Sequence, residues 1–192
     1  MNRKGLKIAS TVGLSAVIVI GAVFAYGYFT RQNNQAVVDP VVSSAFSFEG
    51  VAGWHQGATN EFSMALFDDS ADMGCFASVE RHDGTVDVAA ELKKATYAAQ
   101  ERGDGYTVKV TGSQEMTLHS ATGDLPYTLQ QSAVATPKGT DPLKAGQQFG
   151  FIQQDGFYIK IMSYCDSPNE LDSALPALRA VTLQNNQRHP LD

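Results

Sequence analysis

The chain has 192 residues, of which 43% are hydrophobic and 18% are charged, so it is long enough for one folded domain and too apolar for wholesale disorder. The formal net charge of −6 is unevenly divided, because all four charges up to position 31 are basic and the rest of the chain has 10 basic and 20 acidic residues, a formal charge of −10. That acidic excess excludes nucleic acid as an expected partner.

Residues 8–29 (IASTVGLSAVIVIGAVFAYGYF) form an uncharged apolar run, and about 20 such residues cross a bilayer as a helix. Three basic residues precede the run and Arg31 follows it, which predicts a cytoplasmic N-terminus and an outward-facing remainder. We expect residues 1–31 to be a cytoplasmic tip and single-pass anchor in the lipid bilayer of the cell membrane. The alternative is a signal sequence that is cleaved near Ala25, after which the protein is secreted.

Beyond the anchor, residues 32–44 predict a linker, 45–184 an extracytoplasmic domain and 185–192 a flexible tail. Alternating apolar residues and turn signals predict strands along the domain. The expected strands are Ala45–Phe48, Glu61–Phe67, Cys75–Arg81, Tyr106–Val110, Glu115–His119, Tyr127–Ala135, Gln147–Gln153 and Phe157–Cys165.

Two helices are expected among these strands. The first begins near Asp83 and runs to Arg102, with one apolar face formed by Val88, Leu92, Ala95 and Ala99. The second begins at Ser167-Pro168-Asn169-Glu170, a capping sequence, and buries Leu171, Leu175 and Leu178. The resulting fold class is α+β, with an antiparallel β-sheet packed by a mid-chain helix and a C-terminal helix and preceded by one transmembrane helix.

Phe48, Gly53-Trp54 and the strand at Tyr158–Cys165, in this order of elements, resemble the Mog1/PsbP-like fold over residues 45–184. The resemblance implies an α/β/α sandwich in a binding or assembly factor. No functional residue of that family corresponds to a position here.

The two cysteines, Cys75 and Cys165, lie outside any CxxC motif and away from clustered histidines, so no zinc site is expected. In an exported domain an even pair of cysteines favours a disulfide, whereas a cytosolic domain would hold two reduced, buried thiols.

The acidic turn from Asp68 to Gly74 suggests calcium, but Met73 stands where an EF-hand loop needs glycine, and a solvated hairpin turn is the better interpretation. Trp54 and His55, next to Gly53 and Gly57, are candidates for a contact groove, although a core role for Trp54 is favoured. The four histidines (His55, His82, His119 and His189) are scattered, so we predict no metal site.

The sequence contains no GxSxG motif, phosphate-binding loop or dinucleotide fingerprint, so no catalytic residue and no cofactor are predicted. The favoured function is a membrane-anchored binding or accessory protein of the cell envelope, whose partner is another envelope protein. The alternatives are an extracytoplasmic hydrolase and a ligand sensor, each with a site that forms only in three dimensions.

Overall fold

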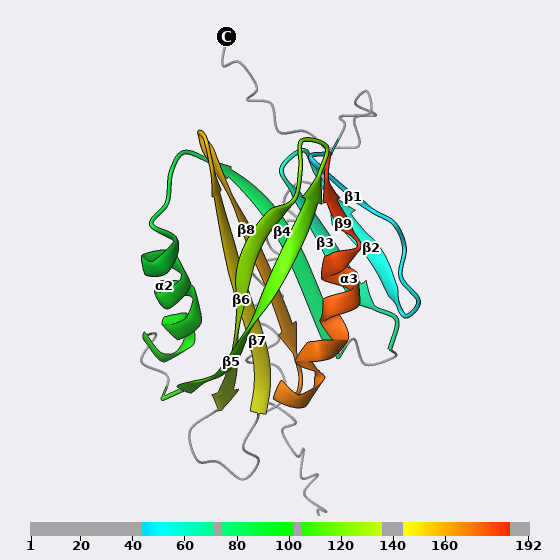
Figure 1. Ribbon diagram of the computed structural model, residues 1–192. Helices are drawn as coiled ribbons and strands as arrows, with labels where there is room; N and C mark the ends of the chain where they lie inside the picture. Colours follow the sequence, from blue (N-terminus) through cyan, green and yellow to red (C-terminus); the bar gives the residue numbers. More distant parts are fainter. Residues whose placement is uncertain (1–43, 71–73, 102–104, 136–143, 185–192) are drawn as a thin grey trace, which may run out of the picture. The chain divides into compact units, whose positions relative to one another are not determined.

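The computed structural model describes residues 44–70, 74–101, 105–135 and 144–184. This part of the chain is dominated by strands, which Figure 1 shows as one curved sheet. The strands are β1 (Phe46–Phe48), β2 (Trp54–Thr59), β3 (Ser63–Asp68), β4 (Cys75–Asp83), β5 (Thr107–Ser120), β6 (Leu125–Ala135), β7 (Lys144–Gln154), β8 (Phe157–Cys165) and β9 (Val181–Leu183).

The order of the strands across the sheet is β1-β9-β5-β6-β7-β8-β4-β3-β2. All neighbouring strands are antiparallel except β5 and β9, which are parallel. The two ends of the sheet are linked, because the backbone N–H of Ala45, just before β1, donates to the carbonyl of Glu61, just after β2, at 3.0 Å. The sheet is therefore almost closed on itself.

One face of the sheet carries the hydrophobic core. Strand β8 illustrates the pattern, because its alternate residues Phe157, Ile159, Ile161, Ser163 and Cys165 are buried, whereas those between them are half-buried. Complete burial of one leucine or isoleucine side chain stabilises a fold by about 1.5–3 kcal/mol. The side chains without measurable exposure include Leu66, Leu129, Ile159 and Leu183.

The C-terminal segment covers this core face. It consists of the 3₁₀ helix η1 (Pro168–Ala174) and the short α-helix α3 (Leu175–Arg179), and its Leu171, Leu175 and Leu178 are buried in the core. The Ser167 hydroxyl accepts a hydrogen bond from the Asn169 N–H and caps η1. The expected buried stripe is confirmed, whereas the segment is mostly a 3₁₀ turn.

Helix α2 (Val88–Glu101) packs on the opposite face, over β5, β6 and β7 (Figure 1). Its buried residue is Thr96, whose hydroxyl accepts a hydrogen bond from Gln130 Nε2 at 2.7 Å. The Thr96 carbonyl accepts another from Gln147 Nε2 at 2.7 Å. The expected apolar residues of this helix are only half-buried, so polar side chains fix its position on the sheet.

The expected fold class is wrong. The sheet is mixed rather than antiparallel, because β9 runs parallel to β5, and its nine strands outweigh the few helical residues. The two additional strands, β2 and β9, are not predicted from the sequence. Among the residues of β2 whose burial is described, Trp54 is the buried one and Gly57 interrupts the strand; the three residues of β9 are too few to show an alternation.

The expected transmembrane helix is not found in the part of the chain that the structure describes, where no helix is long and apolar enough to cross a membrane. Residues 8–29, on which that expectation depends, lie outside the described residues, as do the linker up to position 43 and the tail 185–192.

Candidate functional site

The face of the sheet opposite the core, which we call the outer face, carries a row of rings across β2, β3, β4 and β8. This aromatic row consists of His55, Phe67, Phe76 and Tyr164. The three pairs are direct cross-strand neighbours: His55 lies opposite Phe67, Phe67 opposite Phe76, and Phe76 opposite Tyr164. Side chains alternate between the faces of a sheet, so residues in direct register point to the same side.

The ring of Phe67 contacts the rings of both His55 and Phe76. The centroids of His55 and Phe67 are 5.8 Å apart with an interplanar angle of 29°, and those of Phe67 and Phe76 are 5.3 Å apart with an angle of 45°. At its other end, the rings of Tyr164 and the buried Phe149 are nearly perpendicular, with centroids 5.7 Å apart. Phe67, Phe76 and Tyr164 are half-buried and His55 is exposed, so the row is a partly accessible aromatic platform.

A glycine makes room for one of these rings. Gly57 in β2 has no side chain, and a Cβ atom built there would lie 2.6 Å from Phe67 Cδ2. Real Cβ atoms essentially never approach so closely, so the absence of a side chain at position 57 lets the Phe67 ring cover the backbone of β2.

A charged cluster lies further along the same face of β4 and β8, four residues from Phe76 and Tyr164. Glu80 Oε2 is 3.2 Å from His82 Nε2 and 3.7 Å from Lys160 Nζ, and the His82 ring stacks on Tyr158 with centroids 4.9 Å apart. Burial opposes ionisation of Glu80, but the hydrogen bond with His82 and the charge of Lys160 outweigh it and hold its pKa below the ordinary value.

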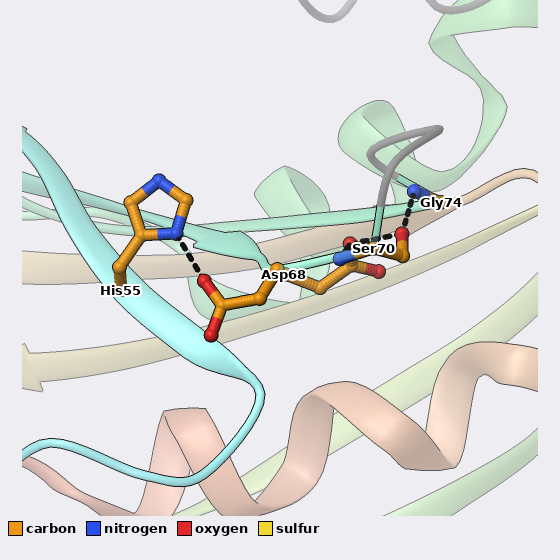
Figure 2. A network of polar contacts seen from close by, with 5 residues as sticks. His55, Asp68, Ser70 and Gly74 are labelled. Carbon is orange, nitrogen blue, oxygen red and sulfur yellow. Dashed lines mark hydrogen bonds and ion pairs between the residues drawn. The ribbon is translucent and has the colours of Figure 1, made fainter.

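At the other end of the row, His55 contacts the turn after β3. Its Nδ1 lies 2.6 Å from Asp69 Oδ1, and both side chains are more than half exposed. Figure 2 shows His55 beside this turn, in which the Ser70 hydroxyl donates to Asp68 and accepts from the Gly74 N–H at 3.0 Å. The imidazole and the carboxylate therefore border the row as exposed polar groups.

In the predicted hairpin turn, the carboxylate of Asp68 accepts hydrogen bonds from backbone N–H groups, whereas in a calcium loop the first aspartate binds the ion. Asp68 Oδ1 accepts a hydrogen bond from the Ser70 N–H at 3.0 Å, and Oδ2 accepts one from the Cys75 N–H at 2.8 Å. Both oxygens therefore support the turn itself. Within the described ranges, no three histidine, cysteine or acidic side chains are grouped to hold a metal; residues 71–73 of the turn are outside those ranges.

The two cysteines form a disulfide, which confirms that prediction. Cys75 in β4 and Cys165 in β8 stand directly opposite each other, with Cα atoms 4.1 Å apart, and the bond joins positions 90 residues apart in sequence. Both residues are buried, and η1 covers them, since Ser173 Oγ lies 3.3 Å from Cys75 Sγ. The bond fixes the register of the two neighbouring strands that carry the Phe76–Tyr164 and Glu80–Lys160 pairs.

The structure separates Trp54 and His55, the two residues considered for a contact groove. They are consecutive in β2, so their side chains point to opposite faces: Trp54 lies in the hydrophobic core, and His55 lies on the outer face. His119 is distant in the strand order and contacts Asp124 at 2.8 Å in the β5–β6 turn. His189 lies outside the described residues.

Sequence reasoning missed Phe67, Phe76, Tyr164 and Glu80 as candidate site residues. A local signal existed, because Phe76 and Glu80 occupy the positions of β4 that alternate with the buried Ala77 and Val79. The missing information was the pairing of β4 with β8, two strands separated by most of the domain.

Comparisons with known proteins give little further information. No known protein family matches the sequence, and no curated protein shows significant similarity to it. A crystal structure from Bacteroides thetaiotaomicron VPI-5482 is similar in part, with a TM-score of 0.41 and 10% sequence identity. The match covers 78% of this chain and 50% of the other, so this chain spans about half the length of that protein.

Proposed function

We propose that this protein is an extracytoplasmic binding module of the cell envelope and that it binds its partner through the outer face of β2, β3, β4 and β8. The aromatic row is the observation that supports this binding face. Its contacting, half-buried rings offer a large apolar area to a partner at little cost in side-chain entropy. Among the described residues, helix α2 packs on the neighbouring strands β5, β6 and β7, beside this part of the sheet.

The disulfide supports a position outside the cytoplasm. Disulfides persist in oxidising compartments and are rare in the reducing cytosol, and the Cys75–Cys165 bond is the bond that an exported domain would form. Attachment to the membrane through residues 8–29, or release after cleavage near Ala25, stays a sequence-based prediction. So does the Mog1/PsbP-like resemblance, whose implied role as a binding or assembly factor agrees with this proposal.

Binding to isolated cell envelopes tests the proposal. The full-length chain, purified in detergent and diluted below the micelle threshold, is sedimented with envelopes of the source organism from which this protein has been deleted. We expect saturable co-sedimentation of the wild type. Phe76→Ala should weaken it at least tenfold, because this substitution removes the ring at the centre of the aromatic row.

Phe62→Ala is the matched control, because Phe62 is an exposed phenylalanine (46%) that does not belong to the row. It should bind like the wild type. Circular dichroism and the intact disulfide show that each variant is folded. Equal binding of the folded Phe76→Ala variant and the wild type would contradict the proposal.

A further inference from the structure

Deepening the proposed function, on which this step depends, we infer that the aromatic row binds a neutral oligosaccharide by stacking on the faces of its sugar rings. A pyranose ring presents flat patches of weakly positive C–H groups, which are attracted to the negative face of an aromatic ring. The same sugar carries hydroxyl groups around its edge, which need hydrogen-bonding partners beside the platform.

The geometry of the row suits a chain of rings rather than a single small molecule. Its members come from four consecutive strands of the sheet, with successive centroids 5.8 Å and 5.3 Å apart at one end. The rings lie on strands whose register is fixed by backbone pairing and by the disulfide, so the platform is formed before the ligand arrives. A preformed platform spares the ordering cost that a loop would have on binding.

Polar groups lie at one border of the platform and, four residues further on, along two of its strands. His55 and Asp69 stand at its β2 end with side-chain exposures of 57% and 53%, so both can exchange hydrogen bonds with ligand hydroxyls. Along β4 and β8, Glu80 and Lys160 offer an acceptor and a donor that are about one-quarter exposed. Carboxylate, imidazole and ammonium groups together can satisfy hydroxyls that donate and accept.

The charges of this face favour an uncharged ligand. The carboxylate of Asp69 contacts His55, and that of Glu80 contacts both His82 and Lys160, so neither sign is concentrated on the face. An anionic glycan needs a cluster of cations, and a basic peptide needs a cluster of acids. On β4 and β8 the ammonium group of Lys160 is paired with the carboxylate of Glu80, and a neutral, hydroxyl-rich chain is the complementary ligand.

Isothermal titration calorimetry of the full-length chain against cellohexaose, maltohexaose and chitohexaose tests the inference. We expect saturable binding of at least one of these neutral hexasaccharides and no binding of a polygalacturonate hexasaccharide. Phe76→Leu, which keeps apolar volume but removes the ring, and His55→Ala, at an exposed position that the fold tolerates, should each weaken binding at least tenfold. Phe62→Ala should leave the affinity unchanged.

Two results would overturn the inference: no binding of any neutral hexasaccharide, or binding that Phe76→Leu and His55→Ala leave intact. Preference for the anionic hexasaccharide would overturn it as well. If the neutral sugars fail while envelope binding still depends on Phe76, the ligand class is wrong and the binding face stands. If envelope binding is also independent of Phe76, the proposed function fails.

Discussion

The ring of Phe67 lies against the backbone of Gly57 on the neighbouring strand, so closely that a Cβ atom at position 57 would come within 2.6 Å of Phe67 Cδ2. The absence of a side chain at position 57 leaves room for the ring of Phe67 next to β2. Gly57 in β2 therefore determines where the ring of Phe67, a member of the aromatic row in β3, can lie.

Gly57→Ala should displace the Phe67 ring and weaken envelope binding about tenfold. Overpacking of this kind costs about 1–3 kcal/mol of stability, so the variant should stay folded in a stable domain. Gly112→Ala is the control, because the nearest atom to a Cβ at that position, Gln131 Oε1, lies at an ordinary 3.7 Å. Unchanged binding of Gly57→Ala in the co-sedimentation assay would show that the position of Phe67 does not matter.

Replacing both Cys75 and Cys165 with alanine should destabilise the domain. The bond closes a loop of 90 residues, for which the chain-entropy model gives a contribution of about 4–5 kcal/mol. Urea unfolding of the double variant and of the wild type measures the difference. Because both sulfurs are buried, reductant should act slowly on the folded wild type and quickly in urea. Equal midpoints for the double variant and the oxidised wild type would contradict the assigned role.

Thr96→Val should loosen helix α2. The substitution removes the hydroxyl that accepts from Gln130 but keeps the carbonyl that accepts from Gln147, so we expect a loss of about 1–2 kcal/mol. Thr96→Ser keeps the hydroxyl and serves as the control. Amide hydrogen exchange should accelerate in Val88–Glu101 in the valine variant and much less in the serine variant. Equal exchange in both would mean that the hydroxyl does not hold the helix.

The stability of the outer face should depend on pH through Glu80. Its pKa is lower in the folded state than the ordinary value of 4.5, so its ionised form stabilises the fold above that value. This contribution is lost as the pH falls through the folded-state pKa. The stability difference between wild type and Glu80→Gln, measured by urea unfolding, should therefore be largest near neutral pH and shrink below pH 4.5. A difference that grows on acidification would contradict the sign.

Part of the fold is readable from the sequence because it depends on local patterns. The expected strand Phe157–Cys165 coincides with β8, whose strict alternation of apolar residues marks a strand with one buried face. The capped start at Ser167 is also local and is confirmed. Two expected strands, Tyr106–Val110 and Glu115–His119, are instead parts of the single strand β5, which continues through an irregularity between Val110 and Gly112.

Local sequence patterns could not predict the mixed sheet or the aromatic row, because both depend on which strands become neighbours. β9 joins β5 in parallel although some sixty residues separate them, and Phe76 lies opposite Tyr164 across an even longer gap in sequence. Alternation places each ring on the non-core side of its own strand, but only the pairing brings the rings into one row. The packing of helix α2 differs from the prediction for another reason. Its apolar spacing predicted a hydrophobic contact with the sheet, whereas Gln130 and Gln147 of the sheet donate hydrogen bonds to Thr96.

Hydroxyl-radical footprinting of the full-length chain, free and bound to isolated envelopes, tests the binding face most directly. The method reports the solvent accessibility of individual side chains through their oxidation, read by mass spectrometry. We expect Phe67, Phe76 and Tyr164 to be oxidised more slowly on envelopes than in free protein, while Phe62 reacts equally in both. Protection of Phe62 with unchanged oxidation of the three rings of the aromatic row would contradict the assignment of this face.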